Sequence, residues 1–140
     1  MNNNTNKILV NNYRGFSEFS LDGLTDVNLF VGKNNSGKTS LLESVHLLAS
    51  NGDPEVLVEI ARRRGEYSSE LDDDYSRLAI SHFFHGHHVD SGSNFRISCK
   101  NYGHPVVVST VPASEMVDEL PALFDPDGTA IPVLAVQISD

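Results

Sequence analysis

Several things are scarce in this sequence of 140 residues, beginning with cysteine. The single cysteine, Cys99, excludes an internal disulfide and makes a reducing compartment the simpler setting. No apolar run approaches the ~20 residues that span a bilayer, and residues 1–6 are polar and lack the apolar core of a signal peptide. We therefore expect a cytoplasmic protein with no membrane partner.

Basic residues are also few. Ten lysines and arginines stand against 19 aspartates and glutamates, and the formal net charge is −9. Such a chain has no overall attraction for DNA or RNA, so DNA contact would need a local patch or a larger assembly. The basic run Arg62 to Arg64 ends an expected helix, where it complements the negative helix end. A contact with DNA phosphates is the alternative, opposed by Glu66, Glu70 and residues 72–74.

Hydrophobic periodicity gives the expected order of elements. Residues 1–6 read as a disordered start, and the alternation of Val27, Leu29 and Val31 with polar or aromatic neighbours predicts a strand that ends at Gly32. Asp53 and Pro54 predict a helix start, and Gly65 its end. The other expected strands are 7–13, 16–21, 94–100, 106–111 and 133–138, and the expected helices are 41–49, 54–64 and 114–120. Residues 77–84 could form either a strand or a helix. A loop is expected at 66–75, and turns are expected at 104–105 and 125–128.

The strongest motif is Gly-x-x-x-x-Gly-Lys-Thr, at residues 32–39, between an expected strand and an expected helix. Its glycines let the backbone curl so that successive amides point at phosphate oxygens, and the helix adds its positive end. Lys38 is expected at the β- and γ-phosphates, the Thr39 hydroxyl on Mg²⁺, and Ser40 at the α-phosphate. ATP and Mg²⁺ are the implied ligands. The alternative is a glycine-rich turn without a ligand.

The segment Asn11 to Phe16 and the loop with its Leu41-Leu42-Glu43 helix resemble the start of RecF/SMC/OLD-group ATPases, which are ABC-type proteins of the AAA family. The Asn34-Asn35-Ser36 variant looks most like the OLD defence ATPases. The resemblance implies an α/β fold: a P-loop NTPase lobe of the ABC/SMC-head type, with a mixed sheet and an antiparallel subregion around the loop and helix. It covers about residues 7–50; we expect residues 7–140 to form this N-terminal lobe, an incomplete domain.

The resemblance also implies a role for Arg14. In relatives, the arginine of the opening Asn-aromatic-Arg triplet lies near the nucleotide phosphates; the alternative here is a surface arginine at a strand end. Gln137, after the apolar run 133–136, matches a Mg-sensing glutamine only weakly. The predicted nucleotide-binding residues are Arg14, Gly32, Asn34, Asn35, Ser36, Gly37, Lys38, Thr39 and Ser40, with Thr39 also the metal ligand.

Two elements of that group are not found in the sequence. One is the aspartate-glutamate pair after an apolar strand; the other is the Leu-Ser-Gly-Gly-like signature supplied by a second subunit. Asp125, flanked by Pro121 and Pro126 and followed by no glutamate, is a poor substitute. No catalytic residue is therefore predicted, and ATP hydrolysis by this chain stays open. The expected partners are the remainder of its ATPase head or a second subunit, a homodimer in full-length form, and DNA through the larger assembly.

Two functions follow. The first is Mg-ATP binding coupled to a DNA-directed activity in repair or anti-phage defence; the alternative is an ATP-sensing module that regulates a partner without hydrolysis. A GTPase would need an Asn-Lys-x-Asp motif, which the sequence does not contain. His82, His85, His87 and His88 crowd one stretch that favours a polar loop, with a metal site as the alternative.

Overall fold

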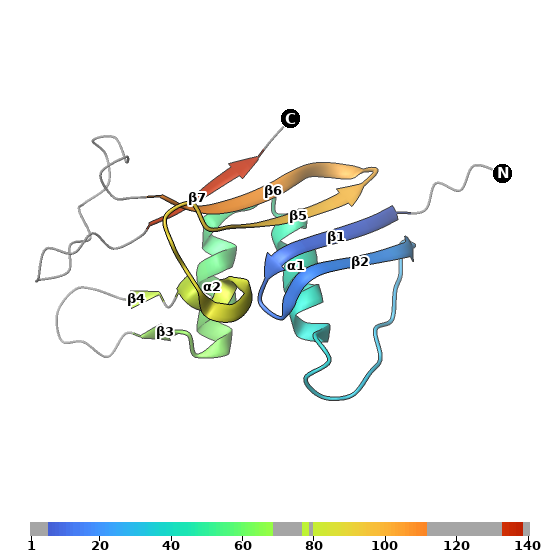
Figure 1. Ribbon diagram of the computed structural model, residues 1–140. Coiled ribbons are helices and arrows are strands. Elements are labelled where there is room, and N and C mark those ends of the chain that lie inside the picture. The colour runs from blue at the N-terminus through green and yellow to red at the C-terminus, as the bar shows by residue number, and fades with distance from the viewer. Residues whose placement is uncertain (1–5, 69–76, 79, 112–132, 139–140) are drawn as a thin grey trace, which may run out of the picture.

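The computed structural model describes residues 6–68, 77–78, 80–111 and 133–138. A five-stranded sheet in the order β2-β1-β5-β6-β7 forms one layer, and two helices beneath it form the other (Figure 1). The elements are β1 Asn6–Tyr13, β2 Phe16–Leu24, α1 Lys38–Ala49, α2 Pro54–Arg64, β3 Tyr67–Ser68, β4 Arg77–Leu78, β5 Asn94–Lys100, β6 Tyr102–Val111 and β7 Val133–Ile138, with 3₁₀ turns at Ile80–Phe83 and His85–His87.

The core lies between the sheet and the helices. Alternate residues of the strands turn inward, because successive side chains of a strand point to opposite faces. The inward residues of β1, β5 and β6 are Ile8, Val10, Phe95, Ile97, Val106 and Val108. They meet the buried faces of the helices, formed by Leu41, Ser44, Leu47 and Leu48 on α1 and by Val56, Leu57, Ile60 and Ala61 on α2. This packing fixes the position of α1, and therefore of the loop that leads into it.

The second helix has the predicted bounds and caps. Asp53 accepts a hydrogen bond from the Glu55 backbone amide at 2.9 Å, and Pro54 occupies the first helical position. Gly65 ends the helix in the left-handed conformation, with φ 69°. Both devices satisfy backbone groups that a helix end leaves unpaired. The first helix, predicted from residue 41, begins three residues earlier, at Lys38.

The strand predicted at residues 27–31 is wrong. This segment has no strand pairing, and Val27, Leu29 and Val31 are 88%, 85% and 83% exposed. Local hydrogen bonds compete with strand formation: the Asn28 amide donates to the Thr25 carbonyl oxygen at 2.6 Å, and the Thr25 backbone amide donates to Asn28 Oδ1 at 3.0 Å. Figure 1 shows the chain leaving β2 and passing below α1, away from the sheet.

The sheet differs from the prediction in its pairing. Every pairing among the described residues is antiparallel, so the parallel part of the expected mixed sheet is not seen there. The turn predicted at 104–105 is also wrong: β5 and β6 reverse at Lys100 and Asn101, where Asn101 is left-handed with φ 68°. Pro105 is tolerated inside β6 because the pairing with β5 is irregular between Ile97 and Cys99.

The remaining expectations divide three ways. The strands at 94–100 and 133–138 are confirmed. Residues 77–84 contain the short strand β4 and a 3₁₀ turn, and β3 opens the expected loop at 66–75. Of the expected disordered start at 1–6, Asn6 belongs instead to β1, and residues 1–5 lie outside the described residues, as do the helix at 114–120 and the turn at 125–128. No helix in the described part of the chain is long and apolar enough to span a membrane.

Candidate phosphate-binding site

The glycine-rich loop leads directly into the N-terminus of α1. Gly37 occupies the N-cap with φ 85°, and no side chain accepts a hydrogen bond there. The first turn of the helix contains no acidic residue. The first intrahelical bond runs from the Leu41 amide to the Gly37 carbonyl oxygen at 2.9 Å. The amides of Lys38 to Ser40 therefore have no intrahelical acceptor, which together with the helix dipole suits an anion.

Lys38 folds back across the loop. Its ammonium donates to the carbonyl oxygens of Gly32 at 2.8 Å and Lys33 at 2.6 Å, and to Ser36 Oγ at 3.3 Å. The lysine thus brings the two ends of the loop together and holds its own charge inside the ring of backbone. An arriving phosphate would offer the same ammonium a stronger, charge-assisted partner.

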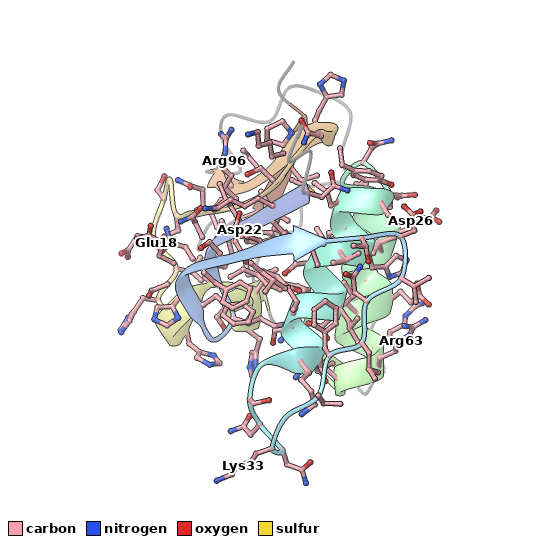
Figure 2. All side chains as sticks on the ribbon, turned by 90° about the vertical axis from the view of Figure 1, so that its right-hand side faces the viewer. Glu18, Asp22, Asp26, Lys33, Arg63 and Arg96 are labelled. Atoms are coloured by element: carbon pink, nitrogen blue, oxygen red, sulfur yellow. The ribbon has the colours of Figure 1, made fainter. Side chains whose placement is uncertain are left out.

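Both glycines of the motif have close neighbours at the position of a Cβ. A Cβ at Gly37 would lie 2.9 Å from Phe16 Cζ, and one at Gly32 would lie 3.0 Å from Ser36 Oγ. Asn35 is left-handed with φ 61°, a conformation that asparagine tolerates better than most residues. Asn34, Asn35 and Ser36 are exposed, and Figure 2 shows Lys33 at the far end of the loop, away from the body of the molecule.

The two hydroxyls after the lysine face different surroundings. Thr39 is exposed and lines a hollow of about 250 Å³ with Glu43 and Arg63. Ser40 is buried, its Oγ accepts from Arg64 Nη2 at 3.5 Å, and its carbonyl oxygen accepts from Ser44 Oγ at 2.8 Å. The first turn of α1 therefore presents Thr39 and Ser40 to two separate spaces.

Arg14 is held by carboxylates in the turn between β1 and β2. Its guanidinium donates to both Glu66 oxygens, at 2.8 and 2.9 Å, and its Nε lies 2.7 Å from Glu43 Oε2. Arg64 Nε reaches the other Glu43 oxygen at 2.7 Å, and the Tyr13 hydroxyl donates to Glu43 Oε2 at 3.2 Å. Two arginines and two glutamates thus form one connected network.

This network shifts the titration of its members. Burial alone would lower the pKa of Arg14, but hydrogen bonds to Glu66 and the Coulombic effect of Tyr13 outweigh it and raise that pKa. Burial likewise opposes ionisation of Glu66, yet the hydrogen bonds and charge of Arg14 lower its pKa. Burial, and then the charge of Glu43, raise the pKa of Tyr13. Arg14 and Glu66 therefore stay charged at neutral pH.

A pocket of about 690 Å³ joins this network to the loop. Five predicted site residues line it together: Arg14, Asn35, Ser36, Gly37 and Ser40. Gly32, Asn34, Lys38 and Thr39 are not part of its lining, and Lys38 instead crosses the loop. Eight further residues of the lining are absent from the predicted site: Gly15, Phe16, Arg64, Glu66, His82, His85, Gly86 and His87. In the sequence, the histidine run points to three of them and the basic run at residues 62–64 points to Arg64.

The other candidate sites find less support. Arg63 pairs with Glu59, and Arg64 pairs with Glu43, so both charges are locally compensated. Among the described residues, no group of three or more His, Cys, Asp or Glu side chains could hold a metal ion.

Comparison with known families agrees with this geometry. The AAA ATPase domain family matches residues 5–111. The chain belongs to the AAA ATPase domain family. Membership of this family implies nucleotide binding. In this chain, the features that suit such binding are the glycine-rich loop and the start of α1.

Curated relatives of this AAA-family chain are proteins named DNA replication and repair protein RecF. The protein from Staphylococcus carnosus is 39% identical over 72 residues, covering 45% of this chain and 20% of the relative. The protein from Lacticaseibacillus casei is 32% identical over 84 residues, covering 54% of this chain and 23% of the relative. One from Staphylococcus aureus is 36% identical over 72 residues. The chain thus spans about a fifth of the length of these relatives. No solved structure matches it.

Proposed function

We propose that this chain is the phosphate-binding lobe of an ABC/SMC-like ATPase head and binds Mg-ATP at residues 32–40. The observation that carries the proposal is the cradle itself. The loop is closed by Lys38, leaves no room for a Cβ at Gly37, and ends at a helix start without a side-chain cap. Such a cradle offers backbone amides and one ammonium to a polyphosphate.

Each group has a distinct part in binding. Lys38 would exchange its loop carbonyls for β- and γ-phosphate oxygens, and the Ser40 hydroxyl would meet the α-phosphate. Thr39 would hold Mg²⁺, which would neutralise part of the phosphate charge. Arg14 would act at the wall of the same pocket, where its pairing with Glu66 and Glu43 limits its free charge.

The lobe also needs a partner for its uncovered apolar segment. Val27, Leu29 and Val31 expose three large side chains just before the phosphate-binding loop. We propose that strands from the remainder of the ATPase head, or from a second subunit, pair with this segment. Alternating apolar side chains and unpaired backbone are what an added strand requires. A homodimer of the full-length protein fits the same proposal.

A DNA-directed role rests on the relatives. The curated relatives are named for DNA replication and repair, which supports a repair-type activity. The OLD-like defence role rests on the Asn34-Asn35-Ser36 resemblance alone. Because the net charge is −9 and Arg63 and Arg64 are paired with glutamates, DNA contact belongs to the larger assembly.

Binding and turnover can be tested separately on this chain. A fluorescent ATP analogue is titrated with and without Mg²⁺, and phosphate release is followed at saturating ATP. We expect Mg-dependent binding and no multiple turnover, since no strand in the described part of the chain is directly followed by an aspartate-glutamate pair. Absence of any nucleotide binding would refute the proposal, and steady turnover by the chain alone would refute the idea of an incomplete head.

The alternative, an ATP sensor that regulates a partner without hydrolysis, is favoured by the same missing pair. The ATP sensor and the ATPase head differ in how the complete assembly behaves. A sensor would bind ATP there and still release no phosphate, whereas an ATPase head would turn over once its second half is added.

A further inference from the structure

A turn rich in histidine lines the same pocket as the phosphate-binding loop. His82 and His87 line that pocket together with Ser36 and Ser40. The two imidazole rings lie 4.9 Å apart, centroid to centroid, and stand nearly perpendicular at 83°. The His82 side chain is 45% exposed, and His87 is exposed as well. Two exposed imidazole rings therefore meet edge to face in the lining of the pocket, at a place here called the histidine corner.

This corner is firmly positioned. The Arg14 amide donates to the Phe83 carbonyl oxygen at 2.9 Å, and His85 Nδ1 lies 2.9 Å from the Arg14 carbonyl oxygen. Phe83 and Phe84, between the histidines, are buried and anchor the turn in the core. The left-handed pair Gly86, φ 75°, and His87, φ 59°, then kinks the chain and sets the direction of the His87 ring.

The charges on the wall are already paired. Arg14 is matched by Glu66 and Glu43, and Arg64 by Glu43. The pocket is thus poorly suited to a second free anion, because its cations already have carboxylate partners. A flat, uncharged aromatic group suits two exposed imidazoles and a neutralised polar wall better.

We infer that the histidine corner is the subsite for the base and ribose of the nucleotide whose phosphates the loop binds. This inference rests on the proposed function. Ser40, placed at the α-phosphate, lines this pocket, whereas Thr39, placed at the metal, lines the other hollow. The end of the nucleotide beyond the α-phosphate therefore enters the pocket with the histidines. Its volume of about 690 Å³ is within the range of small-molecule sites, and histidine is among the side chains on which bases stack.

The test compares a ligand that has a base with one that does not. Mg-ATP and Mg-tripolyphosphate are titrated calorimetrically into wild type and the double variant His82→Ala/His87→Asn. Asparagine is chosen at position 87 because it tolerates the left-handed backbone. We expect the double variant to lose about tenfold in affinity for ATP, as for one stacked base, and to keep its affinity for tripolyphosphate.

The chain offers a matched control and a rescue. His88→Ala removes a histidine of the same stretch that lines a different hollow, with Asn12 and Ser93, so both affinities should be unchanged. Used in place of His82→Ala, the substitution His82→Tyr keeps an aromatic ring at position 82. It should bring ATP affinity to within about twofold of wild type, since tyrosine also stacks with bases.

The outcomes separate the two proposals. Unchanged ATP affinity in the double variant overturns the base subsite, and so does an equal loss for both ligands, which would mean that the turn only supports the loop. Failure of wild type to bind either ligand overturns the phosphate site itself. Loss confined to ATP, with rescue by His82→Tyr, supports both.

Discussion

The guanidinium of Arg14 and the carboxylate of Glu66 form a two-point hydrogen bond, at 2.8 and 2.9 Å, between residues 52 positions apart. The pair joins the turn after β1 to the residue that follows the end cap of α2. The side chains are only 7% and 11% exposed, so the ions are largely shielded from water. The Arg14 backbone is also left-handed, with φ 50°, which a non-glycine residue adopts only when its surroundings hold it there.

Removing Arg14 should destabilise the protein. Arg14→Ala leaves Glu66 and Glu43 without their shared partner, and we expect a loss of about 3 kcal/mol in the free energy of unfolding. Urea denaturation measures it. Arg63→Ala is the matched control, because its partner is Glu59 and the side chains are 67% and 47% exposed. Such an exposed pair contributes about 0–1 kcal/mol. Equal losses in the two variants would contradict the network described here.

Stability should fall in acid through Glu66. Its folded pKa lies below the ordinary value of about 4.3, so its stabilisation is present above that pH and is lost as the pH falls through the folded pKa. The difference in unfolding free energy between wild type and Glu66→Gln should therefore be largest near pH 7 and shrink below about pH 4. Carboxylates outside the network titrate in both proteins and cancel. If the difference in unfolding free energy between the two proteins did not change with pH, the pairing with Arg14 would not favour the ionised form of Glu66.

Gly37 is constrained by its neighbour as well as by its backbone. Gly37→Ala places a Cβ 2.9 Å from Phe16 Cζ on a backbone with φ +85°, so Phe16 or the loop must shift, and we expect phosphate binding to be lost. Gly92→Ala is the control, since Gly92 has φ +86° and nothing within 4 Å of its Cβ position. It should lose about 1–2 kcal/mol from backbone strain alone and bind nucleotide normally. If both variants bind Mg-ATP like wild type, the tight contact at Gly37 is unimportant.

The apolar segment before the loop should favour association. The triple variant Val27→Thr/Leu29→Thr/Val31→Thr removes exposed apolar surface while it keeps residues that suit strands. We expect less self-association by light scattering, with unfolding free energy changed by about 0.5 kcal/mol or less. Val10→Thr, at a fully buried position of β1, should instead lower stability. A triple variant that associates like wild type would argue against an open strand edge.

Local signals in the sequence predicted much of this fold. Asp53, Pro54 and Gly65 each act within one helix, so they located α2 correctly. Local signals also located the glycine-rich loop, because its residue types follow from its backbone conformation and close contacts. The predicted strand at 27–31 failed because strand formation needs a neighbour, and the described chain provides none. Alternation alone does not reveal whether that neighbour exists.

The wider site was less predictable for a similar reason. Glu43, Glu66 and Arg14 come from three separate segments, and only the packing of α1 and α2 beneath the sheet brings them together. The histidine run was visible, but nothing local indicated that a kink at Gly86 would turn His87 toward the loop. Arg64 lies in the basic last turn of α2, as predicted, and its guanidinium also bonds to Glu43 and Ser40, which nothing local in the sequence indicates.

The most direct test of the central claim compares two lysines of one loop. Lys38 donates to the carbonyl oxygens of Gly32 and Lys33, whereas the Lys33 side chain is exposed at the far end of the loop (Figure 2). Mg-ATP is titrated into wild type, Lys38→Ala and Lys33→Ala, with urea midpoints as the folding check. We predict a loss of at least about tenfold for Lys38→Ala and none for Lys33→Ala. Equal affinity in all three folded proteins would contradict the assignment of residues 32–40 as a phosphate-binding site.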